Sequence, residues 1–143
     1  MNLSRRDLKL LLPVLAAASA ASQPKQAGRL PSKVYRHTQI PYTGDQRKKC
    51  RMFFHGATHS GFGLEMHETI LGAGEQTHAP HRHEHEEIVI VFDGAVETWL
   101  EGKTELAEAG SVIYFASNQM HSARNAGTTP CRYYVVELRG SEA

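Results

Sequence analysis

The sequence predicts an all-β sandwich or barrel, and three features of the chain after residue 50 indicate it. Short apolar or alternating runs recur along this stretch, and turn residues such as glycine and asparagine separate them. No segment there keeps an apolar period of 3.6 residues, so amphipathic helices are not expected. The run EEIVIVF is apolar on consecutive positions, which predicts a central strand covered on both faces.

The first element is an export signal, predicted over residues 1–20. This segment joins two arginines to an apolar stretch too short to span a bilayer comfortably, and it ends in small residues. Arg5 and Arg6 resemble a twin-arginine signal, the bacterial address for proteins exported already folded, and Ala18–Ala20 resembles a cleavage site. An ordinary secretory signal and an uncleaved anchor are the alternatives. We expect a periplasmic or secreted protein that leaves the membrane once the signal is removed.

Two further segments follow the signal. Residues 21–50 are polar and contain several prolines and glycines, which predicts a linker and an irregular arm with one short strand at 34–40. Residues 51–140 are predicted to form one barrel domain, because a chain of 143 residues is too short for two sizeable cores. The predicted strands of the core cover residues 50–54, 62–71, 86–92, 95–100, 104–106, 111–115, 121–125 and 131–138.

Charge and cysteines exclude several functions. With 16 Lys and Arg against 15 Asp and Glu, the formal charge is +1, so there is no basic field to hold nucleic acid. Cys50 and Cys131 form no Cys-x-x-Cys pair, which argues against a cysteine zinc cage or thioredoxin chemistry. Whether the two thiols pair in an oxidising compartment is left open.

The candidate site is the segment HRHEHEE, residues 81–87, which leads into the EEIVIVF run and shares its two glutamates. Counting by twos back from the strand places His81, His83 and Glu87 on the face that becomes core. Imidazoles two positions apart are close enough to share one ion, and His121 is the candidate ligand from another strand. On its own, such a tract is as well explained by an exposed surface run that binds metal adventitiously.

These residues resemble the first signature of the cupin superfamily. That signature is H-x-H, three or four residues, E, six residues and G, and here it comprises His81, His83, Glu87 and Gly94. The glycine before the signature departs from it, since six residues separate Gly74 from His81 where the family usually has five between the two.

The stretch from Gly110 to Asn125 looks like the second cupin signature. Gly110, His121 and Asn125 stand at their family positions, whereas Ala116 replaces a proline and Asn118 replaces a glycine. Asparagine tolerates the left-handed conformation that such a turn needs, so the fold assignment holds. Both signatures together argue against the surface tract.

The resemblance implies a cupin double-stranded β-helix, a conical antiparallel and jelly-roll-like barrel. It implies one divalent transition metal held by His81, His83, Glu87 and His121, with Fe or Mn favoured and Ni, Zn or Cu compatible. We expect a metal-dependent enzyme, a dioxygenase or an isomerase or lyase, that acts on a small polar metabolite. The alternative is a non-catalytic periplasmic module that binds a small ligand or metal. Cupin barrels commonly pair, so we also expect a homodimer.

The cavity lining discriminates between these functions. An apolar pocket around the ion favours oxygen chemistry or simple binding, and a convergent Arg, Lys or second carboxylate favours an enzyme with a polar substrate. No separate general base stands out in the sequence. His78 is not a ligand of the family pattern, His85 either lines the cavity mouth or is solvated, and His67 either serves the site or lies on an outward polar face.

Overall fold

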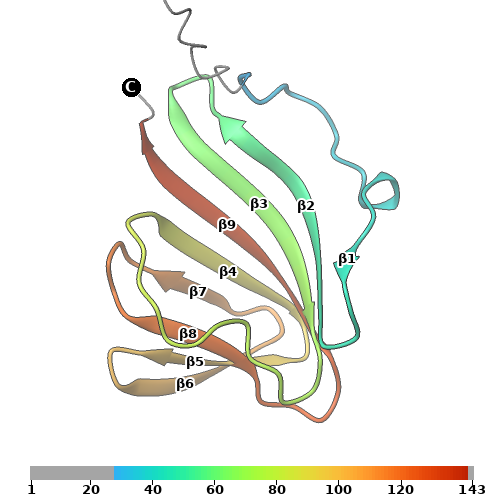
Figure 1. Cartoon of the computed structure of the whole chain (residues 1–143), viewed down its shortest axis with the longest axis vertical. Helices are drawn as coiled ribbons and strands as arrows, with labels where there is room; N and C mark the ends of the chain where they lie inside the picture. The colour runs from blue at the N-terminus through green and yellow to red at the C-terminus, as the bar shows by residue number, and fades with distance from the viewer. Residues whose placement is uncertain (1–27, 142–143) are drawn as a thin grey trace, which may run out of the picture.

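Two antiparallel sheets face each other in the computed structural model, which describes residues 28–141 (Figure 1). One sheet has the strand order β1-β2-β3-β9-β4-β7 and the other the order β6-β5-β8. The elements are η1 (His37–Gln39), β1 (Thr43–Gly44), β2 (Lys48–Ala57), β3 (Phe62–Leu71), β4 (Glu86–Asp93), β5 (Ala95–Leu100), β6 (Lys103–Glu108), β7 (Val112–Phe115), β8 (His121–Asn125) and β9 (Cys131–Ser141). The prediction of an all-β barrel-like fold is confirmed.

Three strands begin and end at the residues that the sequence predicts. The expected strands at 62–71, 95–100 and 121–125 coincide with β3, β5 and β8. Gly94 between β4 and β5 has a φ of 75°, and a Cβ there would lie 2.9 Å from the Cβ of Cys131, so only glycine fits. Asn118 adopts a φ of 62° before β8, as its tolerance of the left-handed region predicts.

The arm before β2 corrects one expectation. The short strand predicted at 34–40 is wrong, because this stretch contains the 3-10 helix η1 instead. The Arg51 guanidinium of β2 donates a hydrogen bond of 2.8 Å to the carbonyl of His37 and stacks 3.6 Å from the ring centroid of Tyr42. The arm is thus held against β2 by side-chain contacts. The predicted signal lies outside the described residues, and the predicted boundaries at residues 20 and 50 stay predictions.

Strand β4 corrects a second expectation. Val89 and Val91 are 1% exposed and lie in the core, whereas Ile90 is 37% exposed and Phe92 is 54% exposed. Strand β4 is therefore covered on one face only, and the prediction of a strand covered on both faces is wrong. The outer face keeps apolar side chains in contact with solvent. In the part of the chain that the structure describes, no helix is long and apolar enough to cross a bilayer.

The long segment between β3 and β4, residues 72–85, runs along the smaller sheet (Figure 1). Its backbone contacts β8 at both ends, where the Asn125 amide donates 2.9 Å to the carbonyl of Glu75 and His81 pairs with His121. The buried Asn125 side chain anchors the start of the segment, because its Nδ2 lies 2.9 and 3.0 Å from the carbonyls of Leu71 and Gly72. This segment carries His81 and His83, two of the four predicted ligands.

Replacing Asn125 with alanine should destabilise the fold without touching the ligand-type side chains. The change leaves the carbonyls around Nδ2 without their donor, and we expect the free energy of unfolding to fall by about 3 kcal/mol. Urea unfolding of the metal-free protein measures this. The matched control is Thr104→Ala on the exposed face of β6. Equal midpoints for Asn125→Ala and the control would contradict the anchoring role.

Candidate metal centre

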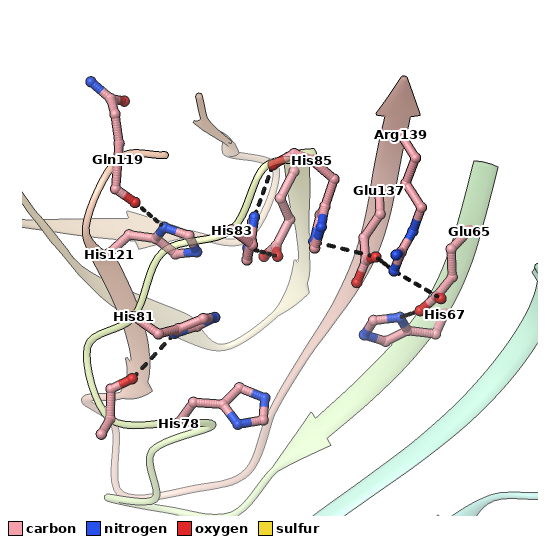
Figure 2. A network of polar contacts seen from close by, with 12 residues as sticks. Glu65, His67, His78, His81, His83, His85, Gln119, His121, Glu137 and Arg139 are labelled. Carbon is pink, nitrogen blue, oxygen red and sulfur yellow. Dashed lines mark hydrogen bonds and ion pairs between the residues drawn. The ribbon is translucent and has the colours of Figure 1, made fainter. Parts of the chain in front are cut away.

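Backbone pairing brings three of the predicted ligands together. His81 and His121 exchange both of their peptide hydrogen bonds, at 3.0 and 2.9 Å, although they come from a loop and from β8. The Asn118 amide donates 2.8 Å to the carbonyl of His83, which fixes the loop two residues further on. The ring centroids lie 4.8 Å apart for His81 and His121 and 4.7 Å apart for His83 and His121. Three imidazoles therefore converge from two separate segments (Figure 2).

Each of these rings is oriented by a carbonyl oxygen. The Nδ1 atoms of His81, His83 and His121 lie 3.2, 2.8 and 2.8 Å from the carbonyls of Ala79, His85 and Gln119. A carbonyl can only accept, so Nδ1 is the protonated nitrogen and the lone pair of each neutral ring resides on Nε2. This is the usual arrangement around a metal-ligating histidine, whose second nitrogen is held by a backbone or carboxylate acceptor.

The chemistry of these nitrogens fits a metal ion. The Nε2 atoms of His83 and His121 are buried and have no hydrogen-bond partner among the described residues. A buried polar atom without a partner is costly, and at a functional site it calls for a ligand. His81, His83 and His121 each offer one nitrogen within 4.8 Å of the others. Imidazole nitrogens in this number suit a divalent transition metal.

Glu87, at the start of β4, stands beside only one of the three histidines. Its Oε2 lies 3.4 Å from Nε2 of His83, and it shares a second candidate group with His83 and His85. The ring of His85 stacks on that of His83 with centroids 3.6 Å apart. The structure thus brings His81, His83 and His121 into one group and places Glu87 next to it. The assignment of all four as ligands stays a prediction.

Burial sets the protonation of the site. It lowers the pKa of His121, while the carbonyl of Gln119 acts in the opposite direction and His83 lowers it further. Burial also raises the pKa of Glu87, against the opposing effect of His83. The lowered pKa disfavours the protonated form of His121, and the raised pKa disfavours the ionised form of Glu87. The histidine is therefore neutral near pH 7, which is the form that ligates a metal.

The facing wall of the cavity carries ionisable groups that the sequence patterns did not reveal. A cavity of about 210 Å³ separates the three imidazoles from Lys48 of β2, His67 of β3 and Glu137 of β9. Glu137 and Lys48 belong to no local motif and meet the site only through strand pairing. His85 lines the cavity too, and its Nε2 lies 3.3 Å from Oε2 of Glu137. The sequence left two interpretations open for His67 and His85, and the structure supports the one in which both side chains line the cavity.

Three remaining residues singled out in the sequence lie as follows. His78 is exposed at the cavity rim, and its Nε2 lies 3.4 Å from Nζ of Lys48. Cys50 and Cys131 are both free thiols, and burial raises the pKa of each. A raised pKa keeps the thiols protonated, so neither is prepared to act as a ligand or a nucleophile.

The comparisons with known proteins agree with this architecture. Residues 67–137 match the family model described as Cupin domain (Cupin_2). No curated protein matches the sequence.

Three solved structures illustrate the likeness of the fold. KdgF from Halomonas sp. is 18% identical, with a TM-score of 0.67 over 78% of this chain and 97% of its own. An RmlC-like cupin from Shewanella frigidimarina is 18% identical, with a TM-score of 0.63 over 82% of this chain and 96% of its own. The polyketide cyclase RemF from Streptomyces resistomycificus is 20% identical, with a TM-score of 0.62 over 78% and 82%. At such identities the likeness concerns the fold alone.

Replacing His83 or His121 with alanine should abolish stoichiometric metal binding. Each change removes a buried Nε2 that makes no hydrogen bond among the described residues, and an ion would lose a nitrogen that the backbone holds in place. Elemental analysis of the purified variants measures the metal content per chain, which should be about one equivalent in the wild-type protein and close to zero in the variants. His78→Ala is the control and should leave the metal content nearly intact. Full metal content in both ligand variants would refute the site.

Proposed function

We propose that this chain, whose residues 67–137 match the cupin domain model, is a metal-dependent enzyme that acts on a small polar metabolite. The observation that carries this proposal is the pair of ionisable walls around the cavity. One wall offers the three imidazoles, and the other offers Lys48, His67 and Glu137. A second wall with a cation, a carboxylate and an imidazole favours a polar substrate over oxygen chemistry or simple binding.

The ion would be held by Nε2 of His81, His83 and His121, with Glu87 as the fourth ligand. Three nitrogens and one carboxylate suit Fe(II) or Mn(II), and Ni, Zn or Cu are compatible with the same donors. When bound, such an ion supplies either Lewis-acid polarisation of a substrate carbonyl or a site for dioxygen. Isomerase or lyase chemistry uses the first, and dioxygenase chemistry uses the second.

The chain's own residues would orient the ligands and bind the substrate. The ring of Phe115 stacks on that of His121 with centroids 4.2 Å apart, which limits rotation of the imidazole in the barrel interior. The apolar side chains of Val89, Phe115 and Val135 also line the cavity and exclude water beside the polar groups. Lys48 supplies a positive charge for an acidic substrate.

A second candidate, a non-catalytic module for a small ligand or a metal, draws on one specific observation. Two ionisable groups of the facing wall already have polar partners, since Oε2 of Glu137 lies 2.5 Å from the Arg139 guanidinium and Nζ of Lys48 lies 3.4 Å from Nε2 of His78. A carboxylate that is already neutralised by a guanidinium can serve to hold a ligand without transforming it.

Turnover distinguishes the two candidates. We expect metal-loaded protein to transform at least one member of a panel of small organic acids, phenolic acids and sugar acids, and metal-depleted protein to transform none. Proton NMR detects isomerisation or cleavage, and an oxygen electrode detects dioxygen uptake. His83→Ala should behave as the metal-depleted protein. Ligand-induced thermal stabilisation without turnover of any panel member would favour the binding module.

Export and pairing complete the proposal. The arginine-containing segment at residues 1–20 supports export to the periplasm, where folding before export would let the protein acquire Fe or Mn in the cytoplasm. Exposed apolar side chains on the outer face of β4 and β7, such as Phe92 at 54% and Val112 at 64%, support a homodimer. Native mass spectrometry of the exported protein should give twice the mass of a chain that lacks 20 residues. A full-length monomer would contradict both proposals.

A further inference from the structure

We propose that Glu65 and His67 form a carboxylate–imidazole pair in which His67 is the catalytic base of the cavity and Glu65 is its positioning residue. This rests on the proposed function and narrows it to proton transfer. The substrate class is a small carboxylic acid in which a carbonyl group adjoins an ionisable C–H bond. Nothing in the sequence motifs points to either residue, since both lie on β3, before the first signature.

The geometry of the pair defines the role of each residue. Nδ1 of His67 lies 3.1 Å from Oε1 of Glu65, and the two side chains are 18% and 13% exposed. Oε2 of the same carboxyl lies 3.8 Å from the Arg139 guanidinium, within ion-pair distance. A carboxylate only accepts, so Nδ1 carries the proton and Nε2 of the neutral ring carries the lone pair.

His67 is the member of the pair that meets the cavity. It belongs to the cavity lining together with the three imidazoles, and Glu65 lies behind it on the same strand. Figure 2 shows the ring of His67 between Glu65 and the wall that carries His81 and His78. A base must be within reach of the proton that it removes, and only His67 of this pair has that access.

A second metal ion explains the cluster less well. Glu65, His67 and Glu137 place one candidate ligand atom each within 4.8 Å of the others, which is close enough to share an ion. The guanidinium of Arg139, however, lies 2.5 Å from Glu137 and 3.8 Å from Glu65. Arginine stays protonated under all ordinary conditions, so a metal here would be forced against a fixed positive charge. The carboxylates of Glu65 and Glu137 already have the Arg139 guanidinium as their cation.

The cavity selects the substrate class. Its volume of about 210 Å³ is below the range usual for drug-sized ligands, so the substrate is small. Lys48 on the same wall and an ion on the opposite wall both attract a carboxylate. If the substrate carbonyl faces the three imidazoles, the acidic C–H bond beside it would face the opposite wall, which carries His67.

The proposed step is a proton transfer that needs no oxidant. Nε2 of His67 takes the proton, and the electron pair of the C–H bond forms a new C=C bond. The carbonyl π electrons move onto its oxygen, which gives an enolate and an imidazolium held by the Glu65 carboxylate. Return of the proton to the other face of the same carbon restores the carbonyl group and the neutral imidazole, and completes an isomerisation.

The pair itself can be tested without a substrate. Long-range proton–nitrogen NMR correlation of protein labelled with ¹⁵N-histidine at pH 8, where free imidazoles are neutral, distinguishes the two ring tautomers. We expect His67 to carry its proton on Nδ1, and Glu65→Gln to lose this preference. Rescue by Glu65→Asp would support a role of the carboxylate. A proton on Nε2 of His67 in the wild-type protein overturns the proposal.

The base can be tested with pyruvate as the probe. Protein loaded with Zn²⁺ should accelerate exchange of the methyl protons of pyruvate with deuterium oxide, followed by the loss of their NMR signal. His67→Gln should slow this exchange by about 10²- to 10⁴-fold, the usual contribution of a general base. Glu65→Gln should slow it by about 10- to 100-fold, as expected for a residue that acts through another. The control, His59→Gln in an exposed turn, should leave the rate unchanged.

The outcomes separate this proposal from the one on which it rests. Wild-type protein that binds one equivalent of Zn²⁺ but gives no exchange, or His67→Gln at the wild-type rate, overturns the assignment of the base. A second bound equivalent that is lost in His67→Gln overturns it in favour of a metal site. Failure to bind Zn²⁺ at all contradicts the proposed function instead, and the nitrogen spectrum then still decides whether Glu65 positions His67.

Discussion

The site depends on one backbone pairing, in which His81 of an irregular segment and His121 of β8 exchange both peptide hydrogen bonds. Residues paired in this way in antiparallel structure have their Cα atoms about 5.5 Å apart and their side chains on one side. Two imidazoles are thereby brought together by the main chain, and His83 follows because its own carbonyl is bound by Asn118. The ligand geometry is thus fixed by peptide groups, which do not change with side-chain rotamers.

This rigidity has an electrostatic consequence. Neutral imidazoles with inward lone pairs repel one another weakly, and the buried Nε2 atoms of His83 and His121 gain no hydrogen bond in return. Burial further lowers the pKa of His121 and raises that of Glu87, so the site disfavours a proton on His121 and a negative charge on Glu87. A divalent ion would relieve both conditions at once, because it accepts the lone pairs and favours the carboxylate. The fold therefore supports an arrangement that is stabilised most by a cation.

The sequence predicted the parts of this structure that local chemistry determines. Alternating patterns and turn glycines defined β3, β5 and β8 correctly, because strand ends follow from residues that cannot continue a strand. The site histidines were recognisable from spacing within two short motifs. The short strand at 34–40 and the outer face of β4 were mispredicted, since a 3-10 turn held by Arg51 and an exposed Phe92 depend on which segment packs opposite. Lys48 and Glu137 were missed because only strand pairing brings them to the cavity.

The two walls of the cavity are built by different parts of the fold, and in the proposed function this would separate metal binding from the choice of reaction. The imidazoles are held by β8 and the segment that pairs with it, whereas the facing groups project from β2, β3 and β9 of the larger sheet. Substitutions on the larger sheet can therefore alter the substrate without disturbing the ligands. In the proposed function, the residues that select the substrate stand opposite the histidines.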